Sequence, residues 1–245
     1  QPVLLGLPMG DLGGALYSVQ GILAALYDRE RTGEGQAIDI SLLDVQVHLQ
    51  AHIGQLYLYS GRIPGPIGNG HETNIPIGAF KAKDGVYVQI SCQLQQFYEN
   101  MSKVLARNVE GLRSLPDDPR FSTNLARIEN REELMSLLAK AFLTKDADDW
   151  LKLLEEGDVP SCKVNNVAEA LSNTHIIQRN MVVETEHPVT GKLKMAGNPI
   201  KMSKAREEIF NPAPLLGEHT EHVLSEILGY SHKELLSMRE AGAVN

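Results

Sequence analysis

Asp11 is the residue whose neighbours in the sequence most favour a catalytic role. Glycines surround it at Gly10, Gly13 and Gly14, and a long apolar stretch follows. As a helix N-cap, this carboxylate would accept a backbone hydrogen bond and stabilise the helix by about 1 kcal/mol. As a nucleophile, it would attack a thioester and form a mixed anhydride, since glycines let a substrate approach closely and free amides of a first helical turn stabilise an anion. Both interpretations stay open on the local sequence.

Three histidines and a glutamate form the other candidate sites. His48 and His52 are four residues apart and would share one face of a helix, as the ligands of a metal site do. A third ligand and the glutamate of a zinc-protease motif are missing, so two surface histidines are the favoured interpretation. His71 and Glu72 follow a glycine turn and either line a cleft or lie solvated in a loop. The hydrolase and redox motifs GxSxG and CxxC are absent.

A helix predicted over residues 12–31 would position Asp11 at its start. This helix is apolar or small on nearly every face, which is typical of a helix buried by neighbours on several sides. We expect a short strand at 37–41 and a second helix at 42–59. The proline- and glycine-rich segment 61–70 is the best candidate for a domain boundary.

The remainder of the chain mixes short strands with helices. Asp84 and Gly85 are a turn signal between two β-rich runs. The predicted elements are a hairpin at 79–90, helices at 93–105, 130–143, 147–157 and 167–171, paired strands at 181–186 and 192–195, and helices at 218–228 and 231–241. This mixture predicts an α/β protein in two blocks. Neither GxGxxG nor GxxxxGK(S/T) occurs, so a nucleotide-binding βαβ core is not expected.

Length and composition exclude several classes of protein. The chain has 245 residues, of which 42% are hydrophobic and 22% charged, so collagen-like, disordered and disulfide-scaffold proteins are excluded. A dispersed net charge of −8 disfavours a nucleic-acid partner. No apolar run is long enough to span a membrane. Cys92 and Cys162 are more typical of buried small residues than of nucleophiles, and two cysteines favour a reducing compartment, either cytoplasm or, in a eukaryote, mitochondrial matrix.

Seven motifs in this sequence resemble, in order, those of the class III coenzyme A transferases. This is the CaiB/BaiF family, which includes formyl-CoA transferase. The motifs lie at residues 8–17, 21–26, 31–36, 80–85, 157–160, 186–188 and 214–220. No single motif is specific, but ordered matches through the whole chain are.

The resemblance implies a reaction and a role for Asp11. In this family the aspartate of the Gly-Asp-x-Gly-type motif attacks an acyl-CoA thioester, giving an aspartyl anhydride and CoA thiolate. The thiolate then attacks the anhydride, leaving an aspartyl-CoA thioester from which an acceptor carboxylate takes the CoA. The acceptor is expected to be a small acid, with dicarboxylates such as succinate as the working choice. The CoA thioester is a substrate, and no cofactor or metal is expected.

The resemblance also implies which residues bind substrate. Near the place of a glycine-rich loop that covers the site in oxalate-using members, this chain has a different sequence at 68–72, so oxalate is not implied. The expected substrate-binding residues are Gly10, Gly13, Gly14, His71 and Glu72.

Family chains are longer, so this chain resembles a C-terminal portion, which fits its start at Gln1 rather than methionine. A CoA-binding Rossmann-like half normally precedes the aspartate motif, and this portion alone is expected to be inactive. The implied fold is a small α+β domain with segments of a Rossmann-like large domain, in a homodimer of two interlocked rings. The implied divisions are the end of the first large-domain segment at 1–55, a linker at 56–75, the small domain at 76–165, a linker at 166–184 and a returning large-domain segment at 185–245.

Two other functions stay open. In the α-methylacyl-CoA racemases of the same family, the aspartate works with a histidine as an acid/base pair across the α-carbon. That histidine would lie outside this chain, so the sequence does not separate racemase from transferase. A non-catalytic interaction fragment is the alternative from another class.

Overall fold

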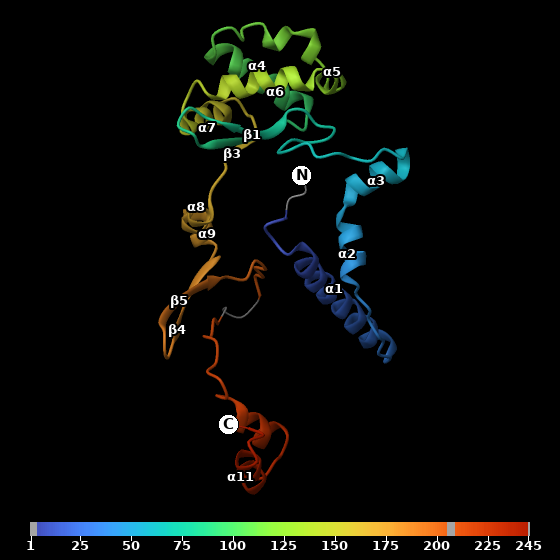
Figure 1. Ribbon diagram of the computed structural model, residues 1–245, viewed down its shortest axis with the longest axis vertical. Helices are drawn as coiled ribbons and strands as arrows, with labels where there is room; N and C mark the ends of the chain where they lie inside the picture. The colour runs from blue at the N-terminus through green and yellow to red at the C-terminus, as the bar shows by residue number, and fades with distance from the viewer. Residues whose placement is uncertain (1–3, 205–208, 245) are drawn as a thin grey trace. The chain divides into compact units, whose positions relative to one another are not determined.

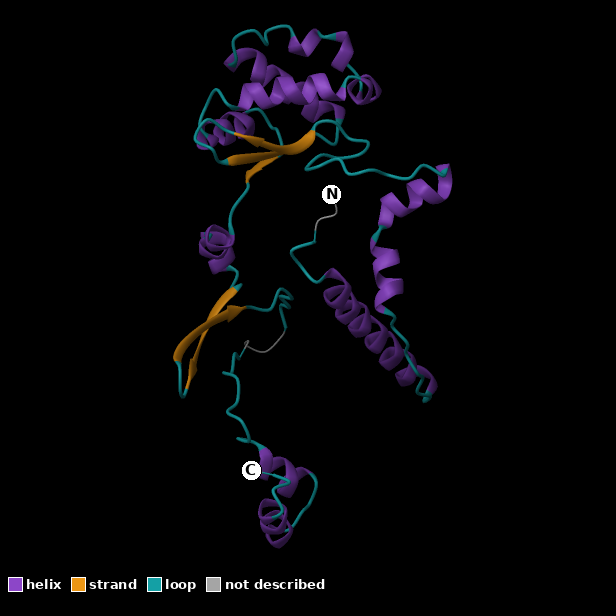
Figure 2. Ribbon diagram, viewed as in Figure 1, coloured by secondary structure: helices purple, strands orange, loops and turns teal. Residues whose placement is uncertain are grey.

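The computed structural model describes residues 4–204 and 209–244. The chain forms two compact units, Gln1–Ile75 and Pro76–Asn245, whose elements are labelled in Figure 1. Within residues 4–75 the structure consists of helices and loops without a strand, whereas the second unit contains both sheets (Figure 2). Assignment of these units to a large and a small domain stays a prediction.

The first helix, α1, covers Met9–Thr32 and therefore begins before Asp11. Pro8 occupies the N-cap position, and its carbonyl accepts a hydrogen bond from the Leu12 N–H at 3.0 Å. The prediction that Asp11 caps this helix is wrong, because the helix begins three residues earlier, where a proline with its fixed φ suits the helix start. Asp11 instead lies inside the first turn, where a carboxylate is favoured by the helix dipole.

Glycines of α1 allow close packing against α2, which covers Leu42–Leu49. A Cβ atom on Gly13 would lie 2.8 Å from Val45 Cγ1, and one on Gly14 would clash with Leu42 Cδ2. Both glycines are buried by this contact. Within this chain only the glycine face of α1 is covered, so burial by neighbours on several sides stays a prediction for the longer protein. The large apolar residues of the other faces are exposed, among them Leu16, Val19, Leu23 and Tyr27.

Two further predictions for the first unit are wrong. The predicted strand at 37–41 is a loop, because it has no strand to pair with in this unit and Ile38 instead packs against Gly21 of α1. The predicted helix at 42–59 is divided into α2 and α3, and α3 covers Ala51–Ser60. The break lies at Ala51, whose φ of 45° is left-handed and interrupts the helical hydrogen bonds.

The second unit is built on a three-stranded antiparallel sheet. Its strands are β1 (Ile77–Lys81), β2 (Tyr87–Ser91) and β3 (Ser161–Lys163), in the order β1-β2-β3. The predicted hairpin is confirmed, with Phe80 opposite Val88 and the turn made possible by Gly85 at φ 87°. β3 was not predicted, because three residues are too few for an alternating pattern to show.

Helices cover one side of this sheet (Figure 1). They are α4 (Gln95–Asn108), α5 (Asn124–Glu129), α6 (Arg131–Phe142) and α7 (Ala147–Glu156), with 3-10 turns η1 (Leu115–Asp117) and η2 (Pro119–Phe121) between α4 and α5. The predicted helices at 93–105, 130–143 and 147–157 are confirmed with shifted ends.

The core of the second unit is aromatic. The rings of Phe80 and Phe142 stack with centroids 5.0 Å apart, and the Phe142 and Trp150 rings lie 4.9 Å apart. The Trp150 indole N–H also donates a 2.8 Å hydrogen bond to the Phe142 carbonyl. Trp150 is fully buried, so this cluster joins α6 and α7 to the sheet.

A buried arginine joins α4 to α5. The Arg127 guanidinium lies 4.1 Å from the ring centroid of Tyr98 and donates hydrogen bonds to Gln95 Oε1 at 3.0 Å and to the Phe121 carbonyl at 2.9 Å. A stacked, hydrogen-bonded guanidinium is a form in which a charge can be buried. Arg127 therefore belongs to the core rather than to a binding surface.

The remaining elements follow the sheet along the chain. They are helices α8 (Val167–Ser172) and α9 (Thr174–Gln178), the hairpin β4 (Val182–His187) and β5 (Gly191–Ala196), then α10 (Thr220–His222), the π-helical turn η3 (Val223–Ile227) and α11 (His232–Glu240). The predicted paired strands are confirmed as β4 and β5. None of the helices among the described residues is long and apolar enough to cross a membrane.

The two cysteines give a test of the core. Burial raises the pKa of the Cys92 thiol from 9.0 to about 12, against an opposing effect of the Arg127 charge, whereas Cys162 is exposed. A shift of this size lowers the reactive thiolate fraction about 1,000-fold. We therefore expect a thiol reagent at pH 8 to modify Cys162 rapidly in the native protein and Cys92 only after unfolding. Equal native rates for both thiols would contradict the buried position of Cys92.

The variant Cys162→Ser is the matched control, because it removes the fast reaction and leaves the slow one.

The raised Cys92 pKa also predicts that the free energy of unfolding falls as the pH rises from about 9 to about 12. Over that range the unfolded chain has released a proton that the folded chain still holds.

Candidate active site

Asp11 is presented to solvent at the start of α1. Its side chain is exposed, and its carboxylate makes no hydrogen bond or ion pair with residues 4–204 or 209–244. The amides of Gly10 and Asp11 precede the first intrahelical bond, so they are donors that the helix leaves without a carbonyl. Such donors stabilise negative charge that develops beside them. An unpaired carboxylate next to open amides can act as a nucleophile on a carbonyl carbon.

The glycines around Asp11 have different neighbours. Gly13 and Gly14 face α2, so their missing side chains serve helix packing. Gly10 faces the amide of Gln46, whose Nε2 would lie 2.9 Å from a Cβ at that position. Gln46 therefore lies against the turn that carries Asp11, a neighbour that no sequence signal revealed. Substrate binding by the three glycines stays a prediction.

His71 and Glu72 line a cleft in the same unit, which we call the His71 cleft. Its volume is about 540 Å³, within the range of small-molecule sites. Its lining comes from α3 and the loop after it: His52, Ile53, Gln55, Leu56, Tyr59, Pro64, Gly65, Ile67, Gly70, His71, Glu72 and Thr73. Asp11 is not among these lining residues. The structure thus gathers His71, Glu72 and α3 at one cleft and leaves Asp11 outside its wall.

The polar contacts of the cleft fix His71 in place. Its Nδ1 accepts hydrogen bonds from the N–H groups of Thr73 at 3.1 Å and Asn74 at 3.2 Å. Its ring stacks on that of His52 with centroids 5.4 Å apart and planes 9° apart. Glu72 forms an ion pair with Arg62 across the same loop. The cleft therefore holds the His71 imidazole in a fixed position beside the Glu72 carboxylate, whose charge is paired with that of Arg62.

His48 and His52 do not form a pair. The helix break at Ala51 separates them, and the His48 ring meets the edge of Tyr17 with centroids 5.5 Å apart, whereas His52 stacks on His71. No group of three or more His, Cys, Asp or Glu side chains able to hold a metal occurs in the part of the chain that the structure describes.

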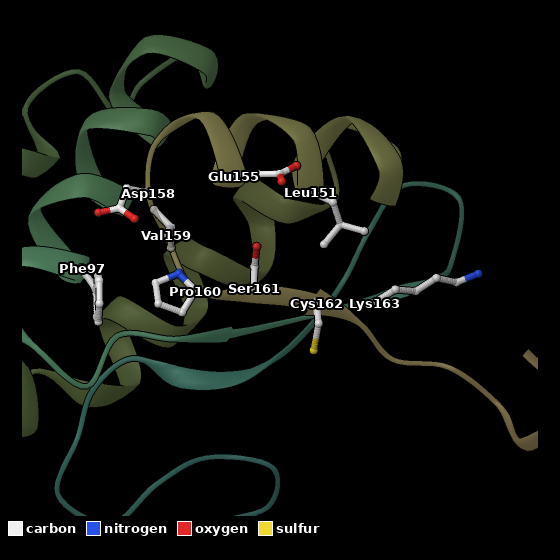
Figure 3. A pocket seen from close by; sticks show the side chains of 9 residues that line it. All are labelled: Phe97, Leu151, Glu155, Asp158, Val159, Pro160, Ser161, Cys162 and Lys163. Carbon is white, nitrogen blue, oxygen red and sulfur yellow. The ribbon is translucent and has the colours of Figure 1, made fainter. Parts of the chain in front are cut away.

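A second cavity, of about 510 Å³, lies beside β3 in the other unit (Figure 3). Asp158, Val159 and Pro160 of the motif at 157–160 line its wall, together with Cys162. Asp158 has a left-handed φ of 53°, and its carbonyl accepts a hydrogen bond from Asn100 at 3.3 Å. This motif therefore forms the tight turn that leads from α7 into β3. Most of the lining belongs to the continuous stretch 151–163, and Phe97 of α4 is the one lining residue from a distant segment, so the local sequence gave no sign of the cavity.

The chain belongs to CoA-transferase family III, whose family model matches residues 1–220. The human succinyl-CoA:glutarate CoA-transferase is 34% identical over 244 residues, which cover 100% of this chain and 54% of the human protein. The succinyl-CoA:mesaconate CoA-transferase of Haloarcula marismortui is 35% identical over 227 residues, which cover 92% of this chain and 55% of that protein. This chain thus spans about half the length of the curated relatives it matches.

Solved structures share the fold. A CaiB/BaiF family protein from Brucella suis matches with a TM-score of 0.75 and 31% identity, over 93% of this chain and 57% of that one. A hypothetical protein from Mycobacterium tuberculosis matches with a TM-score of 0.72 and 24% identity, over 91% of this chain and 56% of that one, which shows the fold alone. The resemblance drawn from the ordered motifs and the mixed α/β fold are confirmed.

Proposed function

We propose that this protein transfers coenzyme A from an acyl-CoA thioester to a carboxylic acid through a covalent intermediate on Asp11. The observation that carries the proposal is the exposed, unpaired Asp11 carboxylate beside the free amides of the first turn of α1. Family membership supports the reaction class. Because one fold can support several unrelated reactions, the function is inferred from this carboxylate rather than from the fold.

The reaction proceeds through two successive covalent derivatives of the Asp11 carboxylate, an anhydride and a CoA thioester. A carboxylate oxygen of Asp11 attacks the thioester carbonyl, the C–S bond breaks, and an aspartyl anhydride and CoA thiolate result. The thiolate attacks the aspartyl carbonyl, which releases the donor acid and leaves an aspartyl-CoA thioester. The acceptor acid then repeats both steps in reverse and leaves as its CoA thioester. No net oxidation occurs, and no cofactor beyond the CoA thioester is required.

The proposed acids are small dicarboxylates. The human and Haloarcula marismortui relatives are named for succinyl-CoA with glutarate or mesaconate as the partner acid, and an Agrobacterium fabrum relative is named succinate–glutarate CoA-transferase. We propose the same class of donor and acceptor here, in an interlocked homodimer. The large apolar side chains exposed on α1, such as Leu16 and Leu23, are consistent with further protein surface covering this helix.

Chemical trapping tests the proposed intermediate. The complete protein is incubated with succinyl-CoA and hydroxylamine, which converts an aspartyl thioester or anhydride to a hydroxamate, and the peptides are analysed by mass spectrometry. We expect modification at Asp11 and none at Asp28, a second aspartate on α1. An unmodified Asp11 during turnover, or exchange of the substrate α-proton without acyl exchange, would overturn the proposal and favour a racemase.

A further inference from the structure

We propose that the side-chain amide of Gln46 donates a hydrogen bond to the thioester carbonyl oxygen while Asp11 attacks the carbonyl carbon. The inference rests on the proposed CoA transfer and names a second catalytic side chain for it. Negative charge develops on this oxygen as the tetrahedral intermediate forms, and a donor placed beside it lowers the barrier. Asp11 is the attacking anion and has no proton to donate, so the donor has to be another group.

Gln46 lies directly against the turn that carries Asp11. A Cβ on Gly10 would lie 2.9 Å from Gln46 Nε2, 3.4 Å from its Cδ and 3.6 Å from its Cγ. The end of the glutamine side chain therefore occupies the space that a side chain at residue 10 would need. Because Gly10 directly precedes Asp11, the Nε2 donor lies beside the residue that adjoins the proposed nucleophile.

The packing of α2 on α1 holds Gln46 in this position. Its neighbour Val45 is buried, and a Cβ on Gly13 would lie 2.8 Å from Val45 Cγ1 and 3.0 Å from Leu49 Cδ1. These contacts on both sides of Gln46 fix how α2 lies along α1, and the two helices run in opposite directions (Figure 1). A donor carried by a packed helix is held in place before the reaction, which is the condition under which such donors stabilise a transition state.

The Gln46 amide is available to a substrate. Gln46 is exposed, and its side chain makes no hydrogen bond within residues 4–204 or 209–244. A carboxamide nitrogen carries two protons and has no charge. A lysine or arginine at this place would form an ion pair with the Asp11 carboxylate and make it a weaker nucleophile, whereas a neutral amide leaves the carboxylate free to attack.

The proposed hydrogen bond changes no atom of Gln46. An Asp11 oxygen forms a bond to the carbonyl carbon, and the carbonyl π electrons move to the oxygen that the Nε2–H group contacts. When the C–S bond breaks, its electron pair leaves with the CoA thiolate and the carbonyl forms again. The proton stays on Nε2 throughout, so Gln46 acts as a hydrogen-bond donor and not as an acid.

The experiment measures CoA transfer from succinyl-CoA to glutarate by Gln46→Ala and Gln46→Met in the complete protein. Alanine removes the amide, and as the best helix former it should preserve α2 at this exposed position. Methionine has nearly the length of glutamine but no hydrogen-bond donor. A side chain that only filled the space beside Gly10 would therefore keep its effect as methionine.

We expect both variants to lower kcat by about 100-fold with little change in KM, because the hydrogen bond strengthens as charge develops on the oxygen. Gln20→Ala is the matched control, since it removes another exposed glutamine from the middle of α1, and its kcat should stay within a factor of about 2. An unchanged kcat in Gln46→Met overturns the role of Gln46 as a donor while the proposed transfer stands. Absence of transfer by the unaltered protein overturns the proposed function itself.

The variant Gly10→Ala tests the contact between the two helices. The added Cβ would displace the flexible end of Gln46, and alanine suits the helix better than glycine. We expect kcat to fall as in Gln46→Ala, and the double variant to be no slower than either single variant, because both changes remove the same interaction. Losses that multiply in the double variant would show that Gly10→Ala acts without Gln46 and would overturn the contact as the source of the effect.

Discussion

Replacing Asp11 by asparagine is expected to lower kcat for CoA transfer at least about 1,000-fold. The amide is nearly the same size as the carboxylate, but it lacks the anionic oxygen that attacks the thioester and cannot form the anhydride. The fold should be retained, because the Asp11 side chain is exposed and makes no contact that holds α1 in place. The cost to stability is the loss of one charge at a helix N-terminus, about 0.3–1 kcal/mol. Initial-rate assays with succinyl-CoA and thermal melts measure the two effects.

Asp28→Asn provides the comparison for Asp11→Asn, since it removes a charge from the other end of the same helix. It should leave kcat within a factor of about 2, as expected for an exposed position outside the site. If Asp11→Asn kept the rate of the unaltered protein, another nucleophile would have to be sought. If both variants lost activity in proportion to a lower melting temperature, the effect of Asp11 would be structural.

Replacing Trp150 by alanine is expected to destabilise the second unit by about 3–5 kcal/mol. Trp150 is fully buried, packs on Phe142 and donates to the Phe142 carbonyl at 2.8 Å. The alanine variant leaves a cavity in the aromatic cluster and a buried carbonyl without its donor, and both effects lower the free energy of unfolding. Urea denaturation followed by far-ultraviolet circular dichroism measures the change in the free energy of unfolding. This measurement does not require the protein to be catalytically active.

Trp150→Phe separates the two contributions. It keeps an aromatic ring beside Phe142 but removes the hydrogen bond, so it should cost less than the alanine variant. Leu125→Ala is the surface control, because Leu125 is 66% exposed and its loss should cost no more than about 0.5 kcal/mol. Similar denaturation midpoints for Trp150→Ala and Leu125→Ala would show that the cluster does not stabilise the unit.

The buried core and the proposed catalytic residue lie in different parts of the chain. The aromatic cluster and the buried Arg127 lie in the unit Pro76–Asn245. Asp11 and the His71 cleft lie in the unit Gln1–Ile75, where few apolar side chains are buried. Substitutions in the core and in the site should therefore give distinct results, with Trp150→Ala acting on unfolding and Asp11→Asn on turnover.

Features that depend on neighbours along the chain could be predicted from residue patterns alone. The long helix after Asp11, the hairpin around Gly85 and the strands β4 and β5 each follow from local patterns and turn residues. The ordered motifs were also enough to indicate the family, which the match to residues 1–220 confirms. Roles for Asp11 and the residues around it could be proposed because residue type and local spacing carry that information.

Contacts between distant residues became apparent only in the folded chain. Local patterns did not separate Pro8 from Asp11 as the start of α1, nor place a break at Ala51, because hydrophobic periodicity marks a helix better than its ends. Gln46 beside Gly10 and the stacking of His52 on His71 depend on contacts between segments. Such contacts are set by packing and loop geometry, which short-range spacing does not encode. The proposed nucleophile Asp11 could therefore be singled out from the sequence, whereas the choice between a cleft and a solvated loop for His71 and Glu72 was made only by the folded chain.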